Sequence, residues 1–332
     1  MSQLQIGING LGRIGRLVCR LGFDSLNIQA INGRCSPKTA AHLLKYDSVH
    51  GTWDREVSYQ ENALIIEGRV IPYFQKEKPE DIPWKKYGVD VVAECTGAFK
   101  KQEDLQKHLA AGAKKVLISA PAEGAELTVV FGVNHLMYQP DKHHLVSLAS
   151  CTTNCLAPVV KVLQNHWKIK KGFMTTVHSY TRDQRVVDSS HKDLRRARAC
   201  GLNIVPTGTG AGTAIGKIFP ELKGRLQSAA LRVPVANVSL VDLTVETEKP
   251  ASSEEINQAF QEISEGELKN ILAVETEPLV SSDFNGRTES SIVDALSTQV
   301  LEGNFMRVLS WYDNESGFSK RMIDFIHFMK KI

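Results

Sequence analysis

Short apolar runs alternate with stretches of helical periodicity through the first half of the chain. Runs typical of buried strands lie at residues 4–9, 27–32, 89–94, 115–119, 128–132 and 144–149. Residues 13–21 place their apolar side chains on one helical face, and residues 101–111 predict a second helix that Gly112 ends. Strands and helices that alternate in this way predict an α/β fold with a doubly wound, mostly parallel sheet.

The hydrophobic pattern changes after residue 150. Longer and partly alternating runs, typical of antiparallel strands with one covered face, lie at residues 173–180, 238–247 and 307–311. Ser252 and Glu255 have the spacing of a capping box, which predicts a helix with Ile256, Phe260 and Ile263 facing inward. This half therefore predicts an α+β domain with a mostly antiparallel sheet.

Two further segments bear on the domain organisation. Residues 181–203 are polar and without apolar periodicity, so we expect a long loop, and loops of this length are usually functional. Residues 319–331 predict a last helix whose apolar face needs a surface to cover it. We expect one domain of residues 1–150 and 316–332, and a second of residues 151–315.

Composition and charge narrow the class of protein. The chain has 332 residues, 42% of them hydrophobic and 23% charged, which excludes collagen, a coiled coil and long disorder. Its net charge of +3 is too small for a protein that mainly covers nucleic-acid phosphates. The six cysteines are scattered, so we expect free thiols. No apolar run approaches ~18 residues and no signal-peptide pattern is visible. We therefore expect a cytoplasmic protein with no membrane association.

The segment after the first strand carries a glycine pattern for phosphate binding. Gly10, Gly12 and Gly15 form a G-x-G-x-x-G between a predicted strand and a predicted helix. Gly10 permits the tight turn, Gly12 lets the backbone approach a pyrophosphate, and Gly15 lets the helix pack closely on the strand. The amides of Arg13 and Ile14 then lie at a helix N-terminus, which favours anions. The first domain is therefore expected to be a Rossmann-type dinucleotide-binding domain.

The end of the second predicted strand lacks the acidic residue that usually bonds the ribose 2′-hydroxyl. Gly33 and Arg34 stand there instead. Without a carboxylate the barrier to a 2′-phosphate is removed, and Arg34 can pair with such a phosphate. Equally, Gly33 can serve a turn and Arg34 can be a solvated surface residue, so the residues alone leave NAD and NADP both open.

Cys151 is the cysteine best placed for chemistry. It follows a predicted strand and begins an apolar-periodic helix, where the helix dipole is expected to favour the thiolate. Ser150, Thr152 and Thr153 add hydroxyl groups suited to an anion, whereas Cys155 is expected to be a buried packing residue. By residue type alone Cys151 can also be a buried thiol. No metal site is expected, because no second Cys/His pair has suitable spacing.

The segment SCTTNC at residues 150–155 resembles the active-site signature of phosphorylating glyceraldehyde-3-phosphate dehydrogenases. Other segments similar to this family follow in the same order over nearly the whole chain: INGLGRIGR at 8–16, LKYDSVHG at 44–51, MTTVHSYT at 174–181, LRVP at 231–234 and SWYDNE at 310–315. The resemblance implies that Cys151 is the nucleophile and His178 its base. It also implies that an imidazolium at His178 stabilises the thiolate.

The implied reaction is the oxidative phosphorylation of D-glyceraldehyde 3-phosphate to 1,3-bisphosphoglycerate through a Cys151 thioester, with hydride transfer to NAD or NADP, a step of glycolysis and gluconeogenesis. By matching position, the substrate phosphate is assigned to Thr181 and Arg232. The attacking phosphate is assigned to Ser150, Thr152, Thr209, Gly210 and Arg195, with Arg196 and Arg198 as open alternatives to Arg195. Asn314 matches the residue that holds the nicotinamide carboxamide, and Thr96 and Ser119 match positions that line the cofactor.

Departures from the family pattern concentrate at the adenosine end of the cofactor. Gly33 replaces the usual Asp, and Ser189 and Ser190 replace a Leu-Pro pair common in NAD-specific members. The resemblance implies that the loop carrying these serines reaches the cofactor of a neighbouring subunit. Both changes make room for a 2′-phosphate, whereas Glu77, where an arginine is common, acts against it. Phe318 and Gly208 are milder departures near the nicotinamide and the phosphate site.

The family resemblance further implies a homotetramer. Two alternatives to the main interpretation remain at the level of the sequence. An erythrose-4-phosphate dehydrogenase shares the cysteine and histidine but releases a free acid, and a non-catalytic protein can use the basic segment at residues 192–198 to bind RNA. The low net charge and the lack of an RNA-binding motif weigh against nucleic acid as a partner.

Overall fold

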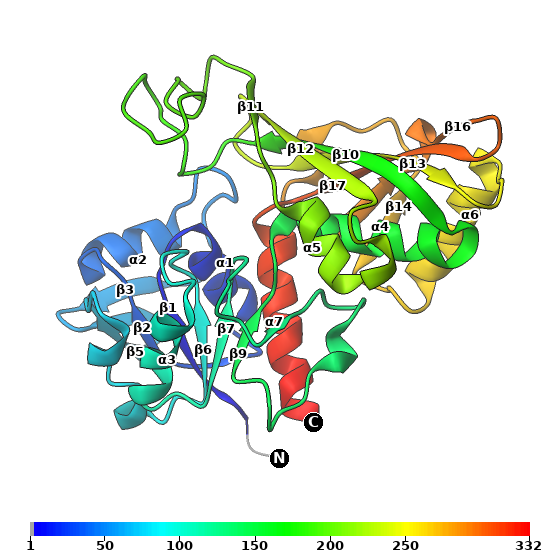
Figure 1. Cartoon of the computed structure of the whole chain (residues 1–332). Coiled ribbons are helices and arrows are strands. Elements are labelled where there is room, and N and C mark those ends of the chain that lie inside the picture. Colours follow the sequence, from blue (N-terminus) through cyan, green and yellow to red (C-terminus); the bar gives the residue numbers. More distant parts are fainter. Residues whose placement is uncertain (1–2) are drawn as a thin grey trace. The chain divides into compact units, whose positions relative to one another are not determined.

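The computed structural model describes residues 3–332 and divides the chain into two compact units. One unit comprises the residues up to Ser150 together with Phe318–Ile332, and the other comprises Cys151–Gly317. Figure 1 labels the elements of both. Among the residues described, none of the helices combines the length and the apolar character that a membrane span requires.

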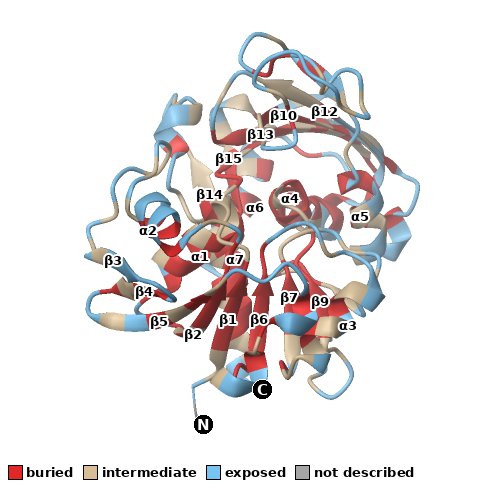
Figure 2. Cartoon of the chain, turned by 90° about the vertical axis from the view of Figure 1, so that its left-hand side faces the viewer, coloured by how far each residue is buried: buried red, intermediate tan, exposed pale blue. Residues whose placement is uncertain are grey.

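The first unit is built on a nine-stranded sheet in the order β3-β4-β5-β2-β1-β6-β7-β9-β8. All neighbours from β5 to β8 are parallel, and β3 and β4 add an antiparallel extension. Figure 2 shows the central strands of this sheet as buried. The expected mostly parallel sheet is confirmed. Its strands are β1 (Gln5–Asn9), β2 (Asn27–Asn32), β3 (Val57–Gln60), β4 (Ala63–Ile66), β5 (Arg69–Phe74), β6 (Val91–Glu94), β7 (Lys115–Ile118), β8 (Leu127–Thr128) and β9 (Leu145–Ser147).

The sequence predicts a strand at residues 128–132, and this prediction is wrong beyond Thr128, where β8 ends. The last ladder bond runs from the N–H of Val129 to the carbonyl of Ser147 at 2.8 Å, and beyond it the side chain of Asn134 bonds the backbone locally. Its Oδ1 accepts from the backbone N–H of Val130 at 2.8 Å, and its Nδ2 donates to the carbonyl of Thr128 at 3.0 Å. Local side-chain bonds of this kind compete with a sheet ladder, so the chain turns away after two residues of β8.

Four helices belong wholly or mainly to the first unit: α1 (Arg13–Gly22), α2 (Pro37–Lys45), α3 (Gln102–Ala110) and α7 (Ser316–Lys331). The sequence prediction missed α2, although Ser36 caps its N-terminus by accepting from the N–H of Thr39 at 3.3 Å and Pro37 occupies its first position. Helix α7 packs on this unit, where the rings of Phe325 and Tyr138 meet edge to face at 5.3 Å.

The second unit is built on an eight-stranded, mostly antiparallel sheet in the order β11-β12-β10-β13-β17-β15-β14, with β16 paired to β17. Two pairs depart from the antiparallel pattern, β10 with β12 and β14 with β15. The strands are β10 (Ile169–Ser179), β11 (Val205–Thr207), β12 (Leu226–Val233), β13 (Ser239–Thr247), β14 (Leu272–Glu275), β15 (Ser291–Asp294), β16 (Gln299–Leu301) and β17 (Phe305–Tyr312).

Three helices accompany this sheet: α4 (Cys151–Trp167), α5 (Ala211–Ile218) and α6 (Ser253–Glu265). The predicted capping box opens α6, because the Ser252 hydroxyl accepts from the N–H of Glu255 at 3.2 Å and the Glu255 carboxyl accepts from the N–H of Ser252 at 2.8 Å. Ile256 and Phe260 are fully buried, and Ile263 is partly buried. The long loop expected at residues 181–203 is also confirmed, since this segment holds only turns and one bridge between Arg185 and Ala199.

A buried polar network in the first unit connects the strand ends around the glycine loop. Glu94, 1% exposed at the end of β6, accepts from Asn9 Nδ2 at 2.5 Å and from the N–H of Thr96 at 2.8 Å. His108 Nε2 lies 3.1 Å from the same carboxyl group. Because Trp84 Nε1 donates to His108 Nδ1 at 3.0 Å, the proton of His108 is on Nε2 and points at Glu94.

This network generates a stability prediction. Replacing His108 with leucine leaves both the Glu94 carboxyl and the Trp84 indole N–H short of a partner in a buried place, so the free energy of unfolding should fall by about 2–4 kcal/mol. Urea unfolding followed by circular dichroism measures the change. The matched control is Gln106→Leu at an exposed position of the same helix. Equal midpoints for the two variants would show that the network does not stabilise the fold.

Candidate active site

Cys151 begins helix α4, as the sequence predicts. Ala149, two residues earlier, has a positive φ of 59° and lets the chain turn sharply into the helix. Cys151 is partly exposed, whereas Cys155 is fully buried with its sulfur 3.5 Å from Ser310 Oγ, which confirms Cys155 as a packing residue. The Cys151 Sγ lies 3.5 Å from Nε2 of His178, so the fold brings together the two residues that the family resemblance pairs.

His178 lies near the end of β10, buried and held from the side opposite Cys151. Its Nδ1 is 2.7 Å from the carbonyl oxygen of Ser179. This carbonyl can only accept a proton from Nδ1, whereas NH1 of Arg232, 2.5 Å from the same nitrogen, can only donate to it. The role of general base requires the first tautomer, with the proton on Nδ1, because the lone pair of Nε2 then faces the Cys151 thiol and accepts its proton.

The Arg232 side chain contacts His178 from the neighbouring strand. The parallel register of β10 and β12 places residues 178 and 232 opposite each other. The Arg232 NH1 lies 2.5 Å from His178 Nδ1 and donates to the carbonyl of Ser179 at 2.9 Å. The Arg232 Nε is buried without a hydrogen-bond partner in the described part of the chain. A guanidinium in this position can turn donors toward an anion near the cysteine.

The electrostatics of the pair differ from the sequence expectation. Burial raises the pKa of the Cys151 thiol, and Arg232 and the hydrogen bonds at the start of α4 lower it by less. Burial, followed by the charge of Arg232, lowers the pKa of His178 to about 3. The hydrogen bonds at the start of α4 act in the direction expected of the helix dipole, but burial outweighs them, and the lowered pKa of His178 opposes the imidazolium that the family resemblance implies. Both shifts favour the uncharged forms, from which proton transfer from sulfur to nitrogen yields the thiolate.

Tyr312 is a site residue that the sequence analysis did not single out. Its hydroxyl lies 2.9 Å from Thr152 Oγ1 and 2.9 Å from Thr176 Oγ1. Its ring meets the His178 ring edge to face, with centroids 6.0 Å apart. The Thr152 hydroxyl is buried in this contact. Only the position of Tyr312 inside the family-like segment at residues 310–315 could have indicated it.

Asn314 is fixed by two hydroxyl groups. Its Oδ1 accepts from Ser179 Oγ and from Ser239 Oγ, each at 2.9 Å, and the side chain is buried. With the oxygen so held, the orientation of the amide is determined by the fold. Ser179 and Ser239 are further positioning residues that the sequence analysis did not identify, because serine hydroxyls in strands carry no recognisable pattern.

The remaining predicted phosphate residues of the second unit lie on two segments. Thr209 and Gly210 immediately precede α5, with Gly210 at the N-cap and no side-chain cap. A Cβ at Gly210 would meet nothing within 4 Å, so the backbone there is open to a ligand. Thr181 starts the long loop, and its N–H lies 3.4 Å from Gln184 Oε1. Ser150 precedes Cys151 and is the last residue of the first unit before the chain crosses to the second.

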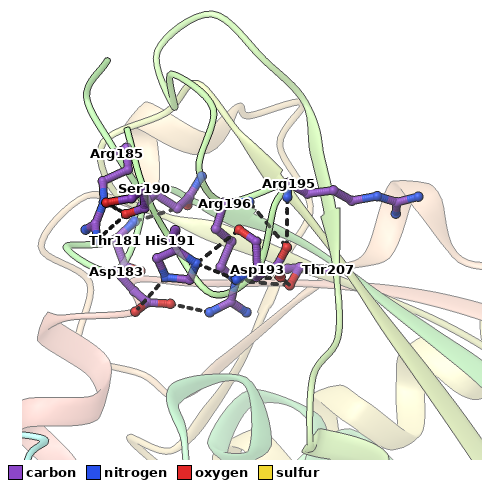
Figure 3. Close-up of polar contacts among 10 residues, drawn as sticks. Thr181, Asp183, Arg185, Ser190, His191, Asp193, Arg195, Arg196 and Thr207 are labelled. Carbon is purple, nitrogen blue, oxygen red and sulfur yellow. Dashed lines mark hydrogen bonds and ion pairs between the residues drawn. The ribbon is translucent and has the colours of Figure 1, made fainter. Parts of the chain in front are cut away.

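The three candidate arginines of the long loop differ in what they contact, and Figure 3 labels two of them, Arg195 and Arg196. Arg196 forms ion pairs with Asp183 and Asp193 and donates to Thr207 Oγ1 at 3.0 Å. Arg198 pairs with Asp188 at 2.7 Å. The Arg195 side chain extends away from the cluster in Figure 3 and is exposed. Arg196 is also the one whose charge lowers the pKa of both His178 and Arg232.

Ser190, predicted to lie near a cofactor, is an exposed residue of the same loop. Its carbonyl accepts from Arg185 Nε at 3.1 Å and from Arg185 NH2 at 3.0 Å. The Ser190 hydroxyl makes no hydrogen bond within the described structure and lies on the surface of the loop.

The glycine loop of the first unit has the geometry of a phosphate-binding turn. Gly10 has a φ of +94° and lies against Thr96, and a Cβ at Gly15 would collide with the carbonyl of Gly10. A Cβ at Gly12 would meet nothing within 4 Å, so the backbone is open at the N-terminus of α1. The Arg13 guanidinium is paired with Asp47, which leaves the amides of Arg13 and Ile14 at the first turn as the anion donors.

The other predicted cofactor residues line the carboxyl edge of the parallel sheet. Gly33 and Arg34 follow β2, Thr96 follows β6, and Ser119 follows β7. Gly10 is tied to this edge because its N–H donates to the carbonyl of Asn32 at 2.8 Å. Ligands of open α/β sheets bind at this edge, so the arrangement fits a dinucleotide.

The chain is similar to known proteins over both units. Residues 4–102 match the family model described as glyceraldehyde 3-phosphate dehydrogenase, NAD binding domain, and residues 150–314 match the one described as its C-terminal domain. The chain is 54% identical to glyceraldehyde-3-phosphate dehydrogenase 1 of Bacillus cereus over 98% of both chains. It is 54% identical to glyceraldehyde-3-phosphate dehydrogenase of Geobacillus stearothermophilus, over 97% of this chain and 96% of the relative.

A further relative is glyceraldehyde-3-phosphate dehydrogenase 2 of Trichormus variabilis, 50% identical over 97% of both chains. These matches extend over both units, and the predicted site residues of each unit fall within the matched ranges except Ser119, which lies between them. The chain therefore belongs to the glyceraldehyde-3-phosphate dehydrogenase family.

Proposed function

We propose that the protein is a phosphorylating glyceraldehyde-3-phosphate dehydrogenase, which converts D-glyceraldehyde 3-phosphate and inorganic phosphate to 1,3-bisphosphoglycerate. The observation that carries the proposal is the 3.5 Å contact between Cys151 Sγ and the buried His178 Nε2 at the start of α4. The family model for an NAD-binding domain and the open backbone at Gly12 support NAD or NADP as the cofactor. When bound, the nicotinamide accepts a hydride.

The chain's own residues supply the covalent and acid–base chemistry. His178 Nε2 accepts the proton of the Cys151 thiol, the sulfur attacks the aldehyde carbon, and His178 returns the proton to the carbonyl oxygen to give a hemithioacetal. His178 then takes the hydroxyl proton of the hemithioacetal as the hydride leaves carbon, which gives a thioester. An oxygen of inorganic phosphate attacks the thioester carbon, the carbon–sulfur bond breaks, His178 returns its proton to the departing sulfur, and the acyl phosphate departs.

Two anions must be held during this cycle. Thr181 and Arg232 are proposed for the substrate phosphate, because Arg232 lies beside the catalytic pair and has a buried Nε without a partner in the described structure. For the attacking phosphate the proposed residues remain Ser150, Thr152, Thr209 and Gly210. The start of α5, at Thr209 and Gly210, is the best supported of these, whereas the Thr152 hydroxyl is engaged with Tyr312. Among the arginines we place Arg196 ahead of Arg195 because its charge acts on His178 and Arg232, although its donors are engaged by Asp183, Asp193 and Thr207.

We also propose a cytoplasmic homotetramer. All six cysteines are free thiols, which is typical of a reducing compartment. Large apolar side chains that are at least 70% exposed gather on the long loop at Val186, Val187, Leu194 and Leu202, and such clusters favour burial against another subunit. Asn314, Thr96 and Ser119 are proposed to contact the cofactor, and the unit of residues 151–315 is proposed to be the catalytic domain.

Replacing Cys151 with serine tests the activity itself. The hydroxyl is a much weaker nucleophile than a thiol, so we expect kcat to fall by at least about a thousandfold while NAD binding is retained. Cys155→Ala on the same helix is the matched control and should keep turnover. Reduction of the cofactor, followed at 340 nm with and without inorganic phosphate, measures both points. Multiple turnover that is equally fast without phosphate would contradict the phosphorylating reaction and indicate hydrolysis to an acid.

The assignment of the loop arginine gives a second prediction. Arg196→Leu should raise the KM for inorganic phosphate or for the phosphorylated substrate by roughly tenfold, because a charge-assisted hydrogen bond to phosphate is lost. Arg195→Leu, one residue away and exposed, should change either KM by less than about twofold. Steady-state kinetics on both variants decide between them, and the reverse order of effects would restore Arg195 as the phosphate residue.

A further inference from the structure

Gly33 occupies a position where the backbone does not itself require glycine. It is absent from the glycines with positive φ, so an L-residue can adopt its backbone conformation. Its N–H donates to the carbonyl of Phe74 at 2.9 Å, which ties the end of β2 to β5. These two strands are parallel neighbours beside β1, as Figure 2 shows. The reason for glycine must therefore lie in what surrounds the missing side chain.

The Tyr73 hydroxyl fills that space. A Cβ at position 33 would lie closer than 3.0 Å to this hydroxyl oxygen, a separation that Cβ atoms essentially never show, and 3.1 Å from the ring carbon Cζ. Tyr73 is 2% exposed, and its hydroxyl donates to the carbonyl of Cys35 at 3.0 Å. Rotating the ring about its long axis does not move an oxygen that lies on that axis. The hydroxyl therefore cannot move aside without breaking a buried hydrogen bond.

Position 33 is where dinucleotide-binding domains place the carboxylate that bonds the ribose 2′-hydroxyl and repels a 2′-phosphate. The exposed side chains nearby are mostly basic. Arg34 follows Gly33, and the backbone of Lys76 is bonded to the Asn32 side chain at 2.9 Å and 3.0 Å, so residues 76–78 lie beside the same strand end. Lys76 and Lys78 are cationic, and Glu77 between them is the opposing charge.

We propose that Tyr73 is a positioning residue for cofactor specificity: by excluding every side chain from position 33, it keeps the ribose 2′ position free of a carboxylate and open to the 2′-phosphate of NADP. This inference rests on the proposed dehydrogenase function. It assigns the adenosine-end specificity to a pair, Gly33 with Tyr73, and predicts that an aspartate at position 33 is accommodated only after the hydroxyl is removed. Without that hydroxyl the nearest atom is Cζ at 3.1 Å, which a shift of a few tenths of an ångström relieves.

The first experiment measures the collision by thermal unfolding of the full-length protein. Gly33→Asp should lower Tm by roughly 4 °C or more, as overpacking does. Adding Tyr73→Phe to it should restore most of the loss, and Tyr73→Phe alone completes the double-mutant cycle. The matched control is Gly33→Asp with Tyr59→Phe, which removes a hydroxyl from a half-exposed tyrosine of β3 and should restore nothing. A Gly33→Asp protein as stable as the wild type would overturn the proposal, as would equal restoration by both hydroxyl deletions.

The second experiment measures specificity, both as kcat/KM for NAD and NADP and as calorimetric binding of 5′-AMP and 2′,5′-ADP without turnover. We expect Gly33→Asp/Tyr73→Phe to raise the NAD-to-NADP ratio of kcat/KM by at least about tenfold, through the cofactor KM and with kcat within about twofold of the wild type. It should also favour 5′-AMP over 2′,5′-ADP. A structural defect would instead lower kcat for both cofactors in parallel, which would overturn the proposal.

The outcomes separate this inference from the proposed function. If the wild type turns over and the double variant shows no change in the ratio, the role of Tyr73 is refuted while the dehydrogenase stands. A full switch in Gly33→Asp alone would also refute it, because the hydroxyl would then exclude nothing. If the wild type neither turns over nor binds either nucleotide, the proposed function and the inference fail together.

Discussion

The parallel pairing of β10 with β12 is the constraint on which the candidate active site depends. Its register places Arg232 opposite His178, and the two side chains then share the carbonyl of Ser179. In an otherwise mostly antiparallel sheet this pair needs a long connection, and the loop at residues 181–203 lies within it. The strand pairing and the functional loop are thus one topological feature: the connection that parallel strands require carries Thr181 and the arginine cluster.

The same register explains the electrostatics of the pair. Burial and the neighbouring guanidinium both lower the pKa of His178, to about 3, and so disfavour its imidazolium form. A neutral base next to a protonated thiol requires a proton to move before sulfur can attack. Arg232 lowers the pKa of Cys151 and its guanidinium is suited to a phosphate, so the residue proposed for the substrate phosphate also acts on the cysteine.

Each unit supports its site with buried polar contacts. In the first unit Glu94 bonds Asn9 and Thr96 and joins His108 and Trp84 to the strand ends around the glycine loop. In the second, Ser179 and Ser239 hold Asn314, and Tyr312 holds Thr152 behind the His178 ring. Buried polar groups are costly unless every partner is in place. Such networks therefore restrict the site to one geometry, and the packing of Tyr73 on Gly33 does the same by sterics alone.

The sequence by itself determined the features that arise from neighbouring residues. Alternating strands and helices, the glycine turn, the start of α4 at Cys151 and the capping box of α6 all follow from periodicity and local hydrogen bonding, so they were predictable. The end of β8 was not, because it coincides with local hydrogen bonds from the Asn134 side chain to the backbone of Thr128 and Val130. The tertiary structure alone decided which distant residues meet: Thr152 and Tyr312 lie 160 residues apart in sequence yet share a hydrogen bond. It also decided the direction in which the pKa values of Cys151 and His178 shift, the contacts of Arg196 and the space at Gly33, because burial and steric exclusion depend on strands that only the completed sheets place side by side.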